Sequence, residues 1–87
     1  VDQGRVIIGD HDRPLWEAMR ARRKELAEEQ SVPAYVIFND KTLYEMLNVK
    51  PTSLEALSHI SGVGEYKLEK YGQTFVELIS GFVVSTV

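Results

Sequence analysis

Apolar residues recur at helical spacing between residues 13 and 30. One helical face carries Leu15, Met19, Leu26 and Gln30, with Trp16 and Ala27 at its edge. Asp12 is of a residue type that caps helices, and Pro14 falls in the first turn, where a backbone N–H would have no intrahelical partner. The pattern predicts a first core helix that begins near residue 13 and ends near residue 30.

Residues 31–38 interrupt this pattern and end in four consecutive bulky side chains. A strand would suit their propensity, but it would have no partner strand in an otherwise helical sequence. We therefore predict a short helical turn that starts at Pro33, with Val36, Ile37 or Phe38 buried and Tyr35 partly exposed.

A third helix is predicted to begin after Asn39, which caps it, and to end at Lys50-Pro51. Its apolar positions are Leu43, Met46 and Leu47. The next four residues match a capping box, in which Thr52 and Glu55 satisfy each other's free backbone donors. A fourth helix should follow directly.

The last third of the chain contains two further apolar patterns. The shorter one is formed by Leu54, Leu57 and Ile60. The longer one, typical of a core helix, comprises Leu68, Tyr71, Phe75, Leu78, Ile79 and Phe82. Gly81 and the polar pair Ser85-Thr86 are expected to close this last helix.

Two glycines separate these last two patterns and indicate a helix-hairpin-helix turn. Gly62 and Gly64 can reach positive φ without a Cβ penalty, and Val63 would point into the joint. Free amides at the start of the next helix, followed by Lys67, suit a phosphate clamp, but the same turn could simply close a helical core. A dinucleotide fingerprint is rejected, because no strand precedes the glycines and Lys67 occupies the third glycine's position.

The composition fits one small helical domain of 87 residues, 44% of them hydrophobic. We expect the domain over residues 13–82, a linker or the end of a preceding domain over residues 1–12, and a tail over residues 83–87. Without cysteine, and with two distant histidines, neither a disulfide nor a metal site is expected. No membrane span or signal peptide is apparent, so a cytoplasmic location is expected, and Val1 in place of an initiator Met suggests a fragment.

Basic residues follow one another on the first helix and form a possible contact for nucleic acid. Arg20, Arg23 and Lys24 could line up as a strip against a phosphodiester backbone, or could belong to a solvated face of weak ion pairs. Arg22 shares the phase of the core positions, so its stem should follow the edge of the core while its guanidinium reaches water. The net charge of −3 argues against binding through a whole basic face, so any nucleic-acid contact must be local.

Tyr35 is the candidate for contact with a base. An exposed aromatic ring beside basic residues is what stacking on an unpaired base requires, at about 1–3 kcal/mol per base. A ring that packs on the core with its hydroxyl at the surface is the alternative.

Taken together, residues 15–20, 32–40, 51–52 and 60–72 resemble the HRDC domain, the helicase-and-RNase-D C-terminal module. The runs PAYVIFND and GVGEYKLEKYG look most like the version in bacterial RecQ helicases. The resemblance implies a five-helix bundle that helps a RecQ-type helicase select or hold DNA, with Tyr35 and nearby basic residues as candidate contacts. Arg22 and Ser61 depart from the pattern, which usually has an apolar residue and often a proline at these positions.

Two functions follow as hypotheses. The first is an accessory module, monomeric and without a cofactor of its own, that binds single-stranded or partly unpaired DNA for a helicase in DNA repair and recombination near the nucleoid. The second is a module that docks on its own helicase core or a partner protein through acidic residues such as Glu25, Glu28 and Glu29, and a ribonuclease D parent also stays open. The sequence contains no catalytic signature, so ATP and Mg²⁺ would serve only the parent protein.

Overall fold

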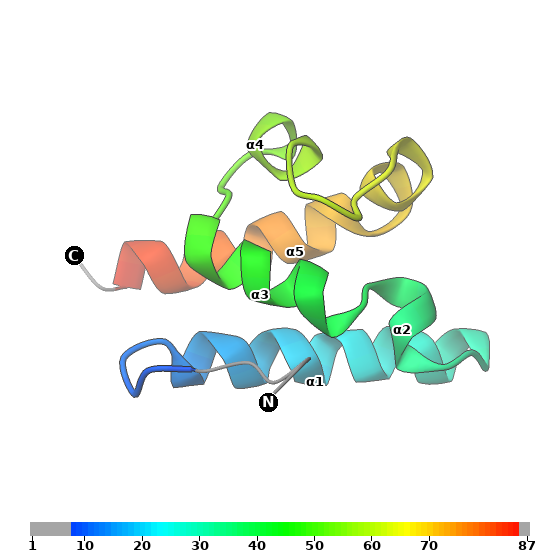
Figure 1. Ribbon diagram of the computed structural model, residues 1–87, viewed down its shortest axis with the longest axis horizontal. Helices are drawn as coiled ribbons and strands as arrows, with labels where there is room; N and C mark the ends of the chain where they lie inside the picture. The colour runs from blue at the N-terminus through cyan, green and yellow to red at the C-terminus, as the bar shows by residue number, and fades with distance from the viewer. Residues whose placement is uncertain (1–7, 86–87) are drawn as a thin grey trace, which may run out of the picture.

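Two long helices run along the molecule with three shorter ones between and beside them, as the computed structural model of residues 8–85 shows (Figure 1). In chain order they are α1 (Arg13–Gln30), α2 (Ala34–Ile37), α3 (Asp40–Val49), α4 (Leu54–Ser58) and α5 (Glu65–Ser85). Helix α1 contacts α2, α3 and α5, and α4 packs on α5. No strand occurs in this range, and the predicted all-α, five-helix fold is confirmed.

The core lies where α1, α3 and α5 meet, and the end of α2 closes it. Phe38 is fully buried, and its ring meets those of Tyr71 and Phe75 edge to face, at centroid distances of 6.0 and 5.3 Å. Trp16 and Ala27, predicted at the edge of the α1 face, are both buried. The buried stripe of α1 is therefore wider than the sequence pattern suggested.

The short second helix forms as predicted. Ser31 ends α1 in the left-handed conformation, with φ 57°, and the extended Pro33 starts α2. Ile37 and Phe38 are buried, whereas Tyr35 and Val36 are exposed. The chain thus turns back so that α2 packs against α1.

The polar caps agree with the prediction at one helix and differ at two. Asn39 accepts a hydrogen bond from the Thr42 N–H at 2.8 Å, as expected. At α4 the capping box of Thr52 and Glu55 is wrong, because Ser53 is the cap and its Oγ accepts from the Ala56 N–H at 3.1 Å.

Asp12 stands at the predicted N-cap of α1, but its carboxylate makes no cap hydrogen bond. It lies instead 3.1 Å from Nζ of Lys50, the residue that ends α3 in the left-handed conformation with φ 53°. The Asp12 carboxylate therefore forms a tertiary ion pair instead of a local cap. The spacing of residues along the chain does not reveal such a pair.

The last helix ends at Ser85, one of the residues expected to close it, but it includes residues 83–85, which were predicted as tail. Gly81 lies inside α5, which continues to Ser85. Phe82 and Val83 pack against the core and carry the helix beyond the glycine. The cost of a glycine inside a helix is only about 1 kcal/mol relative to alanine, so packing decides the end of the helix.

The glycine turn joins α4 to α5 as a tight reversal. Gly62 has φ 91°, whereas Gly64 is not in the positive-φ region, so the expectation of two left-handed glycines is half wrong. Val63 is buried, as predicted. Thr42 of α3 donates its hydroxyl hydrogen to the Ser61 carbonyl at 3.0 Å and so ties the turn to the core.

Gly62→Ser should therefore lower the free energy of unfolding by about 1–3 kcal/mol, whereas the matched Gly64→Ser should leave it unchanged. A Cβ at Gly62 would collide with Thr42 Oγ1 and would have to adopt positive φ; a Cβ at Gly64 meets nothing within 4 Å. Gly64 also precedes α5, where serine is a good cap. Urea unfolding measures both, and equal losses of stability would show that the turn is not built around Gly62.

Candidate nucleic-acid interface

A shallow hollow of about 330 Å³ opens where α2 lies against α1. It is lined by Glu17, Arg20, Ala21, Arg23 and Lys24 from α1 and by Ala34 from α2. The structure thus brings the three basic residues predicted from the sequence to one place, and it sets them beside the short helix that carries Tyr35. The DNA-binding hypothesis needs the basic residues of α1 to lie beside α2, and the sequence alone could not establish this.

Arg20 and Lys24 are exposed, as a phosphate contact requires. Arg20 Nη1 lies 3.8 Å from Glu17 Oε1, and both side chains are about half exposed. A solvated pair of this kind contributes little to stability, so the arginine can exchange its partner at little cost.

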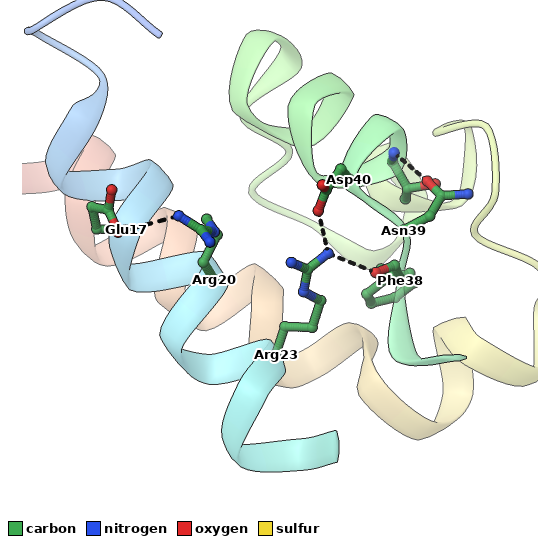
Figure 2. Close-up of polar contacts among 7 residues, drawn as sticks. Glu17, Arg20, Arg23, Phe38, Asn39 and Asp40 are labelled. Atoms are coloured by element: carbon green, nitrogen blue, oxygen red, sulfur yellow. Dashed lines mark hydrogen bonds and ion pairs between the residues drawn. The ribbon is translucent and has the colours of Figure 1, made fainter. Parts of the chain in front are cut away.

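Arg23 differs from the prediction, because it does not lie on the exposed strip. The residue is 8% exposed, and its Nη1 donates to the Phe38 carbonyl at 3.0 Å and to Asp40 Oδ1 at 2.7 Å (Figure 2). Arg22, to which the pattern gave the edge of the core, is half-buried and pairs with Glu25 at 2.7 Å. Arg22 therefore lies at the edge of the core as the pattern indicated, whereas the burial of Arg23 was not predicted.

Asp40 is the residue at this junction that sequence reasoning did not single out. Its carboxylate stands at the start of α3, where the helix dipole also favours a negative charge. An acidic residue directly after a predicted cap is a weak signal, since many first turns carry one for that reason alone. Only the fold brings it to an arginine 17 residues earlier.

Tyr35 presents its ring to solvent, with 67% of the residue exposed. Its neighbours Ile37 and Phe38 anchor α2 in the core, so the tyrosine stands on a fixed element rather than on a loose loop. An aromatic ring held in this way is available for stacking with little loss of conformational freedom.

The glycine turn forms a second, separate group at the start of α5. Gly62 and Gly64 are exposed, and Lys67 is half-buried with its Nζ 5.8 Å from the centre of the Phe38 ring. A cation over an aromatic face is stabilised there, so part of the role of Lys67 is inside the fold. None of these turn residues lines the hollow between α1 and α2.

Tyr66 is a second exposed tyrosine, also 67% exposed, that sequence reasoning missed. Lys70, one turn later, donates to its hydroxyl at 3.1 Å and lies 5.4 Å from its ring centre; this hydrogen bond raises the pKa of Lys70. Lys70 also donates to Gln30 at the end of α1. The spacing of four between Tyr66 and Lys70 could have revealed this contact.

Other kinds of site find no support in the described residues. Within residues 8–85, no three histidine or acidic side chains gather so as to hold a metal ion. None of the helices described there is long and apolar enough to cross a membrane.

Comparison with known proteins assigns the family. The sequence model of the HRDC domain family matches residues 12–79 of this chain. The chain belongs to the HRDC domain family. The resemblance seen in the sequence is thereby confirmed.

The relatives of this HRDC domain include DNA helicases. It is 42% identical over 72 residues to "ATP-dependent DNA helicase RecQ" of Haemophilus influenzae, covering 83% of the chain and 12% of the relative. Identity to the RecQ helicase of Bacillus subtilis is 44% over 72 residues, with the same coverage. UvrD2 of Mycobacterium tuberculosis, also named an ATP-dependent DNA helicase, is 42% identical over 76 residues, 87% of the chain and 11% of the relative.

A solved structure shows the same fold. HRDC domain 3 of D. radiodurans RecQ superposes with a TM-score of 0.79 at 32% identity, covering 85% of this chain and 97% of that one. The chain spans only about 12% of the length of the RecQ relatives that it matches. It is similar to an accessory domain of RecQ-type helicases.

The buried Arg23 and the exposed Asp40 should be coupled energetically through their ion pair. Asp40→Ala leaves the arginine without its acidic partner, and should cost clearly more in the native background than after Arg23→Met. Because Asp40 is 63% exposed, the coupling should be about 1 kcal/mol, below the range of fully buried pairs. Urea unfolding of the four proteins gives the coupling, and Glu25→Ala, which breaks an exposed pair on the same helix, should cost less than about 0.5 kcal/mol. A coupling near zero would contradict the assignment.

Proposed function

We propose that this HRDC domain binds single-stranded or partly unpaired DNA weakly, as an accessory module of an ATP-dependent DNA helicase of the RecQ type. The observation that carries the proposal is the position of Tyr35, an exposed residue of α2 that follows Ala34, which lines the hollow together with Arg20 and Lys24. A base would stack on the ring while the basic side chains meet the neighbouring phosphates.

The charge of the chain fits binding that is local and weak. A net charge of −3 gives no long-range attraction for DNA, so affinity must come from a few contacts at short distance. Arg20 and Lys24 would contact phosphate groups, and stacking on Tyr35 would need a base that is not paired in a duplex. The same contacts accept any base, so little sequence preference is expected.

The names of the relatives support a helicase as the parent protein. RecQ and UvrD2 relatives are each named ATP-dependent DNA helicases, and this chain corresponds to a small part of them. Hydrolysis of ATP with Mg²⁺, and a role in DNA repair and recombination in the cytoplasm near the nucleoid, would belong to the whole parent protein. The domain itself is proposed to bind and not to catalyse.

Docking on the helicase core or a partner protein is the second candidate, favoured by the exposed carboxylates of Glu28 and Glu29 near the end of α1. Contacts between these carboxylates and a basic partner would also weaken as salt rises, so salt alone does not separate the two functions. Titration with oligo-dT does, because docking predicts no resonance shift, whereas DNA binding predicts shifts around α1 and α2 that weaken as salt rises.

Tyr35→Ala should weaken binding of oligo-dT by about 1–3 kcal/mol, with an almost unchanged salt dependence, because stacking releases no counterions. Tyr66→Ala is the matched control, since it removes an equally exposed tyrosine from α5. NMR titration at several salt concentrations measures affinity and location together. Loss of binding in the control alone would move the site to the start of α5, around Gly62, Val63, Gly64 and Lys67.

Arg20→Ala or Lys24→Ala should weaken binding less, but should flatten the slope of log K against log salt by about 0.7 for each phosphate group that the variant no longer binds. Arg22→Ala changes the net charge equally on the same helix, but its side chain does not line the hollow. It should leave the slope unchanged. If oligo-dT shifts no resonance at low salt, the DNA function fails and docking takes its place.

A further inference from the structure

We propose that the hollow between α1 and α2 is a subsite for one phosphate group, with the buried Arg23 as its floor. The inference rests on the proposed function for the source of the phosphate, which would be the strand whose base stacks on Tyr35. It goes further in giving a direct contact to an arginine that lies below the exposed strip.

The bonding of Arg23 leaves donors available. Both of its hydrogen bonds come from Nη1, to Phe38 and Asp40. Its Nε is buried and has no hydrogen-bond partner among the described residues. Figure 2 shows the other edge of the guanidinium turned away from these two partners, on the side where Arg20 stands. Arg23 lines the hollow, and since buried N–H groups are nearly always paired in proteins, its unpaired Nε–H points to an acceptor supplied by a bound ligand.

The lining of the hollow suits an anion. Arg23 lines it, Arg20 and Lys24 add two exposed cations, and Ala21 and Ala34 supply small apolar surfaces. The lining contains no aromatic ring on which a base could stack. A guanidinium presents its donors in a fork that matches two phosphate oxygens, so a phosphodiester fits this lining better than a base does.

Glu17 is the acidic member of the lining, and its carboxylate lies 3.8 Å from Arg20 Nη1. This carboxylate pairs with the Arg20 guanidinium, which the phosphate group would otherwise contact, and it repels an anion that enters the hollow. Asp40 is satisfied on the far edge of Arg23. Removing the charge of Glu17 should therefore strengthen phosphate binding, an outcome that damage to the fold would not produce.

The experiment compares Glu17→Gln with Glu28→Gln. Both replace an exposed glutamate of α1 and change the net charge by the same amount, but only Glu17 lines the hollow. The probe is an eight-residue abasic strand, which has phosphates and no bases, titrated into ¹⁵N-labelled protein while the Arg23 Nε–H resonance is followed. Glu17→Gln should tighten binding about threefold relative to Glu28→Gln, and the Arg23 resonance should shift on binding.

A parallel titration with an eight-residue oligo-dT separates this inference from the proposed function. If oligo-dT binds through Tyr35 while the two glutamate variants behave alike and the Arg23 resonance stays in place, the subsite is wrong and the proposed function stands. If the abasic strand binds as predicted but Tyr35→Ala has no effect on oligo-dT, the subsite is supported and the stacking contact is wrong. If neither strand binds, both proposals fail.

Discussion

The guanidinium of Arg23 joins three elements that the sequence keeps apart. It leaves α1 and meets the carbonyl at the end of α2 and the carboxylate at the start of α3. A buried charge is tolerated only where hydrogen-bond and ionic partners compensate for its lost hydration. The contacts of Arg23 with Phe38 and Asp40 therefore fix the bend between α2 and α3 relative to α1. The position of α2 on α1, and with it the position of Tyr35, depends on this junction. The geometry of the candidate interface thus depends on the buried contacts of Arg23.

The glycine turn depends on another set of contacts. Thr42 holds the Ser61 carbonyl, Gly62 supplies the positive φ, and Val63 enters the core. Lys67 then lies over Phe38, the ring that α2 contributes to the core. The turn and the α1–α2 hollow therefore meet through the core at Phe38, although their exposed residues form separate groups. Val63 and Lys67, which belong to the phosphate-clamp pattern in the sequence, thus have contacts inside the fold.

Helical periodicity was sufficient to predict where the helices lie, because apolar stripes and the Asn39 cap are local signals, whereas the five-helix bundle came from the resemblance to the HRDC domain. It failed where tertiary partners override local rules. Lys50 takes the carboxylate of Asp12 away from its helix, and packing carries α5 past Gly81. The error at the candidate site has the same origin: Arg23 was placed on the exposed strip, but its contacts with Asp40 and the Phe38 carbonyl, which come from elsewhere in the fold, hold it in the interior. The sequence left the exposure of Tyr35 as one of two alternatives, and the structure decides for exposure because Ile37 and Phe38 are the residues of this segment that are buried.

A single strand that lies across α1 and α2 is detected most directly by a distance-dependent measurement. A short oligo-dT with a nitroxide at one end, bound to ¹⁵N-labelled protein at low salt, broadens the amide resonances nearest to the strand. A strand in this position should centre the broadening on residues 17–24 and 34–37 and spare the start of α5. Broadening centred on residues 62–67, with the α1–α2 face unaffected, would contradict the claim.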